Sequence, residues 1–566
     1  MKSLLLILFA FLSFSFSLKT EAQVRERVFV HTDKDCYVTG EDIRLKFYVI
    51  DRDFQPSLLS KVGYVEICNA EKPQIQASVA LEKGGGVGKI RIPMDIPSGT
   101  YQLSGYTRYM RNEGKNTFFR KQIAIVNPGE QTSPNPKRFQ LIEKPENILL
   151  PEKESINEKT PTNLRIKTDQ NKYGNRKKVT LSIDNIPENT ADLVISVSRN
   201  DSIAFVPEVN EQEWVKQVSD TFRLSNQWLP EYEGHIITGS IAPAPPQNQQ
   251  LLSSIAFTGK DIRYFNGQIN PQNNTVNFYT AGIFGKQQIV TTVVNILYAK
   301  VPYRVDLLTP FDESLPDSLP PLQIYPDKKQ LLERYIGAQI QGKMDNDSIN
   351  GLSQSSDYCT FQPLLSYDLD EYTRFNSIDE TILEFISRVH VNKVGGNRII
   401  RIYLDEKQRM SMRTLVLLDG IPIYNHEDIL QYNPMYIKKI NVYDGQYMFG
   451  GENFEGIVSF ITRNADLAFF QLSGESQLLD YDCPQFPLPE KITDYSTESM
   501  KNSRKPDFRH TLYWNPFVEH RNGQPVNLSF YTSDLCGEFK VTVEGITTKG
   551  EMIHGTAYFQ VEKPVK

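Results

Sequence analysis

Short runs in which apolar and polar residues alternate recur along this chain, and they constrain its fold more than any other feature. Alternation with a period of two gives an extended segment one face for a core and one face for solvent, as a β-strand requires. Residues 179–183 and 193–197 follow this pattern, and Gly, Pro, Asn and Asp residues separate such runs at intervals typical of sandwiches. At 566 residues, the chain is therefore predicted to be mostly β and to contain several domains.

Composition supports a folded chain and excludes some classes of partner. Apolar residues make up 39% of the sequence and charged residues 23%, which is ordinary for a globular protein. The 62 basic and 68 acidic side chains give a net charge of −6, so the sequence lacks the basic excess that nucleic acids or anionic membrane surfaces attract. We predict no nucleic-acid partner.

The first 22 residues are typical of a secretory signal peptide. Lys2 supplies the positive charge, residues 4–18 are apolar apart from Ser, and Thr20 and Ala22 are the small residues that precede cleavage at Gln23. The alternative is a membrane anchor, but a helix of this length spans only about 22 Å of a hydrocarbon core that is ~30 Å thick. We predict an exported chain, located in the periplasm or at the outer membrane, whose mature form has no transmembrane helix.

Changes in composition and patterning divide the chain into units. Residues 327–336 and 377–389 carry apolar residues at helical spacing, and the second run opens with a capping box from Ser377 to Glu380. The predicted division is a signal peptide at 1–22, a β-sandwich at 23–128, a linker at 129–162, a second β-sandwich-like domain at 163–228, a third β-rich domain at 229–310, a linker with a helix at 311–369, a small α+β domain at 370–465, a linker at 466–506 and a C-terminal β-sandwich-like piece at 507–566.

The five cysteines leave two alternatives open. Export permits disulfides, and Cys36 and Cys68 lie in one predicted domain where they can pair. Alternatively all five thiols, which also include Cys359, Cys483 and Cys536, are small buried hydrophobic side chains. An odd number leaves at least one thiol unpaired within the chain, and no Cys-x-x-Cys motif indicates a metal or redox site.

No segment of the sequence matches a known catalytic or cofactor-binding motif. The glycine-rich run at 84–89 lacks the Ser or Thr and the following helix of a phosphate-binding loop, so we predict a turn there. The adjacent carboxylates at 379–380 and 405–406 do not face each other at a defined separation, as an acid–base pair requires. Asp419-Gly420 is predicted to be a structural turn that needs positive φ at the glycine.

The histidines show no metal-ligand spacing. None lies four residues from another, and the chain has no His-Glu-x-x-His motif. They are His31, His235, His390, His426, His510, His520 and His554. We therefore predict that the chain is not an enzyme, with no catalytic residue, no cofactor and no metal site, and we leave its partner-binding residues undefined.

One segment resembles a known domain family. Residues 31–43 read His-Thr-Asp-Lys-Asp-Cys-Tyr-Val-Thr-Gly-Glu-Asp-Ile, and residues 96–103 read Ile-Pro-Ser-Gly-Thr-Tyr-Gln-Leu. Together they resemble the macroglobulin-type β-sandwich of the α2-macroglobulin superfamily over residues 23–128, and the modules at 163–310 resemble it loosely. The thioester of that family requires Cys-Gly-Glu-Gln, whereas Cys536 begins Cys-Gly-Glu-Phe here, so the resemblance implies no thioester and no covalent trapping.

A second segment resembles the plug domain of TonB-dependent outer-membrane receptors. The motif elements lie in order at 415–423, 433–442, 447–450 and 456–462. A receptor barrel needs about 22 strands of roughly 9–11 residues, which exceeds the 104 residues that follow Thr462. The resemblance implies a plug-like domain without a barrel, and we expect no transporter pore from this chain alone.

The combination resembles envelope proteins of Bacteroidota. Our leading hypothesis is a non-enzymatic binding or assembly protein of the cell envelope, which presents sandwich and plug-like surfaces to a protein partner, with an outer-membrane barrel as one candidate. One alternative is an accessory subunit of a TonB-dependent uptake system, which would co-purify with a barrel. Another is a thioester-less, macroglobulin-like protein that interacts with proteases, for which residues 129–162 are the candidate bait. The oligomeric state is not predicted.

Overall fold

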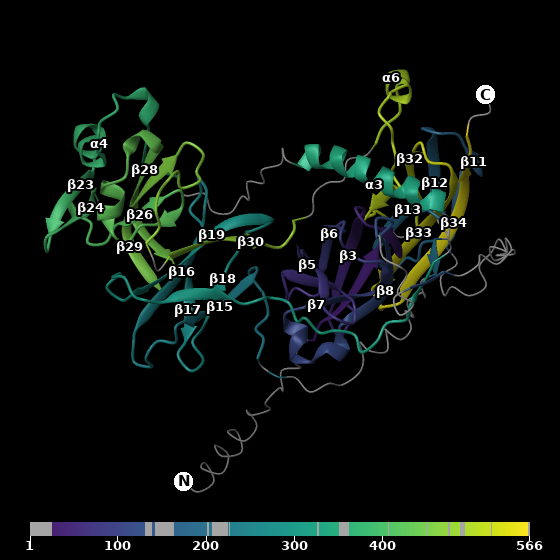
Figure 1. Ribbon diagram of the computed structural model, residues 1–566, viewed down its shortest axis with the longest axis horizontal. Helices are drawn as coiled ribbons and strands as arrows, with labels where there is room; N and C mark the ends of the chain where they lie inside the picture. Colours follow the sequence, from purple (N-terminus) through teal and green to yellow (C-terminus); the bar gives the residue numbers. More distant parts are fainter. Residues whose placement is uncertain are drawn as a thin grey trace, which may run out of the picture.

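The structure, a computed structural model, is mostly β and contains several sandwich-like sheets. Its elements gather into two lobes, which we call the base and the distal lobe (Figure 1). The base contains residues 25–130, 164–205 and 493–563, and the distal lobe contains 229–310 and 362–486. The structure describes residues 25–130, 139–141, 164–200, 203–205, 225, 227–324, 328–349, 362–405, 407–449, 451–473, 476–486, 493–521 and 523–563.

The first sandwich of the base packs a three-stranded sheet on a five-stranded sheet. The smaller sheet has the order β1 (Arg27–Thr32), β3 (Asp42–Ile50), β6 (Gly85–Arg91). The larger sheet has the order β2 (Cys36–Val38), β8 (Phe119–Val126), β7 (Gly99–Thr107), β4 (Val62–Cys68), β5 (Pro73–Ala80). Val28, Phe47 and Tyr106 are fully buried between the sheets, as β-branched and aromatic residues at alternating positions require. The short helices η1 (Tyr109–Asn112) and η2 (Lys115–Thr117) connect β7 to β8.

The second sandwich also packs three strands on five. Its smaller sheet has the order β10 (Arg165–Thr168), β12 (Lys178–Asp184), β32 (Val526–Tyr531). Its larger sheet has the order β11 (Lys172–Tyr173), β34 (Met552–Val561), β33 (Gly537–Thr547), β13 (Thr190–Arg199), β31 (Thr511–Asn515). The fully buried side chains of Leu181, Val541 and Phe539 form part of its core.

The two sandwiches have the same topology. When the eight strands of each are counted in chain order, both have sheets of order 1-3-6 and 2-8-7-4-5. Both also share a corner in which an aspartate accepts a hydrogen bond from the tyrosine four residues later, at 2.9 Å for Tyr37 and Asp33 and at 2.8 Å for Tyr173 and Asp169. The second sandwich is therefore a structural repeat of the first.

The chain interrupts this second copy between its fourth and fifth strands. β13 pairs with β31, and the backbone N–H of Arg199 donates to the carbonyl of His510 at 2.9 Å, although about 310 residues separate them. Residues 163–228 and 507–566, which the sequence predicts to be two separate units, contribute their strands to one sandwich. The difference arises because alternation shows which face of a strand is buried and does not show which strand lies beside it.

The distal lobe is built from residues between those two strands. Its seven-stranded sheet has the order β20 (Arg304–Leu307), β15 (Ile236–Ala242), β18 (Thr275–Tyr279), β17 (Tyr264–Asn270), β16 (Leu251–Phe257), β19 (Lys286–Asn295), β30 (Ser476–Asp482). β30 lies within residues 466–506, which the sequence analysis assigned to a linker. It pairs with β19 in antiparallel register from Ser476 to Asp482, so this segment completes the sheet of the preceding unit.

The remainder of the distal lobe is an α+β unit. Its five-stranded sheet has the order β22 (Leu365–Asp368), β28 (Ile437–Phe449), β29 (Glu452–Thr462), β26 (Leu415–Leu418), β27 (Ile421–Pro422). A second small sheet contains β23 (Val389–Val394), β24 (Asn397–Leu404) and β25 (Arg409–Met410), and the helices are η3 (Leu369–Glu371), α4 (Ile378–Phe385), α5 (His426–Leu430) and η4 (Pro434–Tyr436). The Ser377 side chain caps α4 by accepting from the Glu380 N–H at 3.2 Å, which confirms the predicted helix start.

Helix α3 (Lys328–Ile349) lies across the base (Figure 1) and is longer than the predicted segment, which ended near Ile336. It buries Arg334, Gly337, Ala338 and Gly342 on one face. Nearby, β14 (Ala204–Phe205), β21 (Leu322–Ile324) and β9 (Phe139–Leu141) form a small sheet from three connecting segments. α6 (Glu498–Lys501) precedes the return of the chain to the second sandwich.

The cysteines do not form the pair that the sequence left open. Cys36, Cys68, Cys483 and Cys536 are free, and Cys359 and the predicted signal peptide lie outside the described residues. Cys36 is on β2 and Cys68 on β4, three strand positions apart, which is roughly 14 Å at normal spacing. A disulfide needs Cα atoms within about 7 Å, so this pair is excluded. Among the described residues, no helix has both the length and the apolar character to cross a bilayer.

Candidate functional site

Buried polar contacts fasten the distal lobe to the first sandwich. The Glu231 carboxylate, fully buried, accepts from the Tyr64 hydroxyl at 2.8 Å and from the backbone N–H of Ile236 at 2.8 Å. His235 contacts the same carboxylate through Nδ1 at 3.1 Å and the Tyr481 hydroxyl through Nε2 at 2.6 Å. Burial, followed by the charge of Glu231, raises the pKa of Tyr64 well above its ordinary value, so this hydroxyl stays protonated as a donor. The cluster is a structural junction between the lobes.

Ion pairs join the parts of the base. Arg334 of α3 contacts Glu41 of the first sandwich through Nε at 2.7 Å and Nη2 at 2.8 Å. Burial alone would raise the pKa of Glu41, but Arg334 and Lys34 hold it well below its ordinary value. Between the sandwiches, Lys46 pairs with Asp192 at 2.5 Å. These contacts make the two sandwiches and α3 one body.

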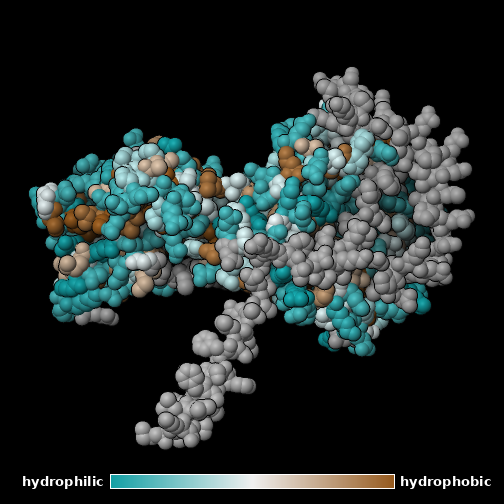
Figure 2. Space-filling model, turned by 90° about the horizontal axis from the view of Figure 1, so that it is seen from below, coloured by the Kyte–Doolittle hydropathy of each residue, from teal (hydrophilic) through white to brown (hydrophobic). Residues whose placement is uncertain are grey.

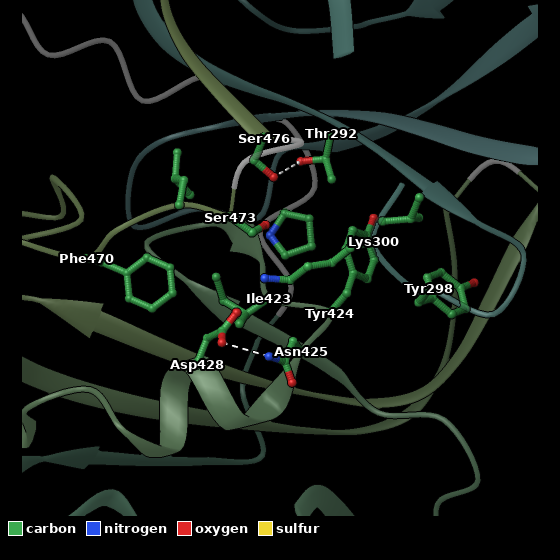
Figure 3. A pocket seen from close by; sticks show the side chains of 13 residues that line it. Thr292, Tyr298, Lys300, Ile423, Tyr424, Asn425, Asp428, Phe470, Ser473 and Ser476 are labelled. Carbon is green, nitrogen blue, oxygen red and sulfur yellow. Dashed lines mark hydrogen bonds between the residues drawn. The ribbon is translucent and has the colours of Figure 1, made fainter. Parts of the chain in front are cut away.

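A small pocket lies between the seven-stranded sheet and the α+β unit (Figure 3). Its volume of about 30 Å³ accommodates about one or two water molecules and is far below the size of typical small-molecule sites. Polar side chains around it are paired with each other: Thr292 with Ser476 at 2.9 Å, and Asn425 with Asp428 at 2.7 Å. Lys300 extends its amine across the pocket. The pocket is a gap at an internal interface and does not fit an organic substrate.

The most exposed apolar side chains belong to the distal lobe. On the face shown in Figure 2, brown surface gathers on this lobe, at the left of the picture. Among the described residues, the hydrophobic side chains that are more than 70% exposed are Leu297, Leu383, Met412, Met448 and Phe469, and all five lie in the distal lobe. Exposed apolar side chains that gather on one part of a protein mark sites of association.

We call Phe469 and the partly exposed side chains on the segments next to it the Phe469 surface. It contains Phe469, Tyr436 and Met435 and, across an ion cluster, Tyr372. The Phe469 ring lies 5.2 Å from the Tyr436 ring, and Phe469 is 85% exposed. Asp370 accepts from Arg463 at 2.8 Å and also contacts Arg374, and these hydrogen bonds, first from Arg463, lower the pKa of Asp370 to about 2. The surface therefore combines aromatic, methionine and arginine side chains.

The loop that carries Phe469 has a costly backbone conformation. Ala465, Leu467 and Phe469 have φ values of 55°, 62° and 64°, a region that costs non-glycine residues free energy. The buried Asp419 carboxylate accepts from the Leu467 N–H at 2.8 Å, and the Tyr432 hydroxyl donates to the Ala468 carbonyl at 2.6 Å. These contacts hold the loop in place, with the Leu467 side chain buried and the Phe469 ring outside.

The charges around the Phe469 surface balance. The segments that carry it are residues 368–374, 435–439 and 463–469. They contain four basic and four acidic side chains, namely Arg374, Lys438, Lys439 and Arg463 against Asp368, Asp370, Glu371 and Asp466. The surface therefore has no net charge.

The sequence-predicted turn at Asp419-Gly420 is confirmed and has a further role. Asp419 has φ 47° and Gly420 φ 81°, the two positive values of a type I′ turn between β26 and β27. The Asp419 side chain also accepts from the N–H and hydroxyl of Thr462 at 2.7 and 2.6 Å. Burial raises the pKa of Asp419. Asp419, which the sequence places in a turn, thus also holds the loop that carries Phe469.

Other sequence features take structural positions. Of the glycine-rich run, Gly84 has φ 77° in a turn, but Gly85–Arg91 is strand β6, so the predicted turn covers only the start of the run. Asp379 is in the first turn of α4, and its carboxylate contacts Arg398. Asp405 contacts Arg388 on the surface. Among the described residues, no group of three or more His, Cys, Asp and Glu side chains has an arrangement that holds a metal ion.

Sequence reasoning missed the residue clusters that join distant segments. His31 is buried and stacked on Trp514 at 5.5 Å, and its Nδ1 contacts Glu544, more than 500 positions away. The Phe469 surface was missed for a different reason, because an aromatic residue next to apolar neighbours in sequence is normally assigned to a core. Its only local signal is the group of polar residues Arg463, Asn464 and Asp466 just after β29.

Comparison with known proteins finds likeness only among solved structures. No protein-family model and no curated protein matches the chain. Native alpha-2-macroglobulin of E. coli is 9% identical with a TM-score of 0.24, over 95% of this chain and 40% of that chain. Salmonella alpha-2-macroglobulin reacted with methylamine is 8% identical with a TM-score of 0.22, over 95% and 40%. The adhesin InvE of Yersinia pseudotuberculosis is 11% identical with a TM-score of 0.14, over 50% and 58%.

The chain thus spans about 40% of the length of the alpha-2-macroglobulins that it matches. At these TM-scores the superpositions do not reproduce the arrangement of the domains. We therefore base no functional argument on them, and the function is argued from the surfaces of this chain.

Proposed function

We propose that this chain is a non-enzymatic binding or assembly protein of the bacterial cell envelope, in which the base positions the distal lobe and the distal lobe binds a protein partner. The observation that carries this proposal is the distribution of exposed apolar side chains. All five hydrophobic side chains that exceed 70% exposure among the described residues belong to the distal lobe. Such surface is costly in water unless a partner covers it.

The construction of the base supports this division of roles. The distal lobe is inserted between two strands of a complete sandwich, and buried polar contacts fix it to the neighbouring sandwich. A lobe that is held at both ends of its chain and at a buried junction is displayed in one orientation. Export, and a location in the periplasm or at the outer membrane, are part of the proposal and rest on the signal-peptide pattern at 1–22.

The test is an affinity pull-down from cross-linked, detergent-solubilised envelopes, read by mass spectrometry. Two C-terminally tagged baits are compared: the full chain, and a chain in which a two-residue turn replaces residues 201–509, which removes the distal lobe together with α3. A defined partner recovered by the full chain and not by the shortened chain is the expected result. Recovery of the same proteins by both baits, or of none, would contradict the proposal.

The same experiment separates the alternatives. A barrel transporter as the dominant partner would favour the accessory subunit of a TonB-dependent uptake system and would give the plug-like resemblance of residues 370–465 a functional meaning. A protease retained after one rapid cut within residues 129–162 would favour the protease-interacting alternative. Most of that segment lies outside the described residues.

A further inference from the structure

We propose that the Phe469 surface binds a folded protein that offers an apolar pocket for the Phe469 ring. The inference rests on the proposed function, because it names the surface of the distal lobe that binds and the chemistry of the partner. Phe469 is 85% exposed, the highest value among the described hydrophobic side chains that are exposed. Its ring is accompanied by Tyr436 at 5.2 Å rather than isolated.

The ring is held ready for binding by the fold beneath it. Three residues of the loop have left-handed backbone conformations, and hydrogen bonds from Asp419 and Tyr432 retain them there. Such conformations persist only where the surrounding structure imposes them, and they gather at binding sites. A loop whose backbone is fixed before association loses less conformational entropy when it binds. The loop therefore acts as a rigid support for one exposed aromatic anchor.

The residue types around Phe469 fit a protein partner. Aromatic, methionine and arginine side chains are enriched in the centres of protein interfaces, and a few such residues carry most of the binding energy. The Tyr436 ring lies 5.2 Å from the Phe469 ring, Met435 precedes Tyr436 in the chain, and the Arg463 N–H donates to the Tyr436 carbonyl at 3.2 Å. The arginine can form polar contacts at the rim of the pocket that takes the ring.

The balance of charge decides against a lipid surface or a nucleic acid. Both attract proteins through an excess of basic side chains. The segments that form the Phe469 surface contain four basic and four acidic residues. A neutral surface with an aromatic anchor instead matches the apolar pocket of a protein.

Binding of the full chain to envelope vesicles tests this inference. The probes are salt-washed envelope vesicles of the source organism, the same vesicles after trypsin treatment, and protein-free vesicles made from the extracted lipids. The variants are Phe469→Ala and a matched control, Leu58→Ala, which removes an exposed side chain (67%) of the base, in the connection between β3 and β4. Both positions face solvent, so both variants should melt at the temperature of the wild type.

We expect the wild-type chain to bind only the untreated vesicles. Phe469→Ala should weaken this binding at least tenfold, and Leu58→Ala should change it less than twofold. Equal binding of Phe469→Ala and wild type would overturn this inference and leave the proposed function standing. Equal binding to protein-free vesicles would identify a lipid surface instead. No binding of the wild type to any vesicle would contradict the proposed function itself.

A photo-crosslinker at the same position identifies what covers the ring. Benzoylphenylalanine in place of Phe469 in the full chain, activated in intact envelopes, should attach to a peptide that lines an apolar pocket of another protein. Attachment to a second copy of this chain would overturn the inference, because the surface would then serve self-association. Attachment to a charged, flat segment of a partner would overturn it as well.

Discussion

Arg334 connects two parts of the molecule, helix α3 and the first sandwich. It lies on α3, 2% exposed, and forms two hydrogen bonds with Glu41 and one with the Cys36 carbonyl at 2.8 Å. Gly342, two turns further along α3, approaches the Arg91 guanidinium so closely that a Cβ would lie 2.3 Å from it. α3 is therefore attached to the first sandwich by charge and by close packing rather than by a wide apolar face.

Arg334→Ala should lower the free energy of unfolding by about 3 kcal/mol, because it leaves the Glu41 carboxylate buried without its main partner. The control is Arg304→Ala, which breaks the exposed pair with Asp306 and should cost less than about 1 kcal/mol. Urea unfolding followed by circular dichroism measures both. Equal, small effects would show that α3 does not depend on this ion pair.

Lys46 makes stability depend on pH. It is fully buried, pairs with Asp192, and its amine lies 4.5 Å from the Tyr48 ring and 4.7 Å from the Phe517 ring. Burial lowers the pKa of Lys46 to about 8, against the attraction of Asp192. In the unfolded chain the pKa is about 10.4, so between pH 8 and about 10.4 the unfolded state holds more protons and stability contributed by this group rises with pH.

Comparison of wild type with Lys46→Met isolates this contribution. Across the window from pH 8 to about 10.4, the difference in unfolding free energy between the two proteins should change by roughly 3 kcal/mol in favour of the wild type. Urea unfolding at half-unit steps of pH measures it. Parallel curves for the two proteins would show that the Lys46 pKa is not lowered in the folded state.

At the scale of elements, the turn between β26 and β27 shows how much a local motif predicts. The sequence Asp419-Gly420 indicates a two-residue turn, and the structure confirms it. The sequence does not indicate that this turn packs against the β16–β17 connection, where the Gly259 N–H donates to the Asp419 carbonyl at 3.0 Å. It also does not indicate the contact with the Phe469 loop, because both contacts depend on segments far away in the chain.

Gly420→Ala should lower the free energy of unfolding by about 3 kcal/mol. The glycine has φ 81°, and an added Cβ would lie 2.8 Å from the Phe257 carbonyl and 3.0 Å from that of Asp261. The matched control is Gly395→Ala, where φ is 60° but no atom lies within 4 Å, so only the backbone cost of about 1 kcal/mol applies. Chemical unfolding compares them, and similar losses at both sites would refute the role of crowding.

At the same scale, the corner that the two sandwiches share shows how little of a common structure the sequence reveals. Asp33 accepts from the N–H of Arg44 at 3.1 Å, and Asp169 accepts from the N–H of Thr180 at 2.7 Å, eleven residues later in both cases. The first corner lies in the segment that resembles the macroglobulin type. Of residues 31–43, the second corner shares only Thr, Asp and Tyr at the same spacing (Thr168, Asp169 and Tyr173), so its sequence alone did not identify the same sandwich.

At the scale of the molecule, the position of the insertion predicts which segments the two sandwiches need in order to fold. A chain in which an Asn-Gly turn replaces residues 201–509 lacks the distal lobe and α3, and it should still fold into the two sandwiches, because β13 and β31 are already neighbours at the cut. Since Glu41 then lacks Arg334, this chain should be less stable than the full chain. A chain truncated after residue 506 should lose a stable second sandwich, because four of its eight strands are β31–β34. If the second sandwich were complete before residue 228, the truncated chain would instead stay folded.

Circular dichroism, cooperative unfolding and size-exclusion chromatography distinguish these outcomes. The shortened chain should be monodisperse and rich in β structure, and the truncated chain should expose residues 164–205 to protease. The opposite pair of results would contradict the joined sandwich.

The sequence by itself determined the mostly β class, the strands at 179–183 and 193–197, the Ser377 cap and the Asp419-Gly420 turn. These features depend on alternation, capping and backbone conformation, which act over a few residues. Only the tertiary structure decided that strands about 310 residues apart form one sandwich, that β30 completes the seven-stranded sheet, and that Phe469 lies outside rather than in a core. The physical reason is that backbone hydrogen bonds are the same for any partner strand, so the packing of side chains from distant segments chooses the partner.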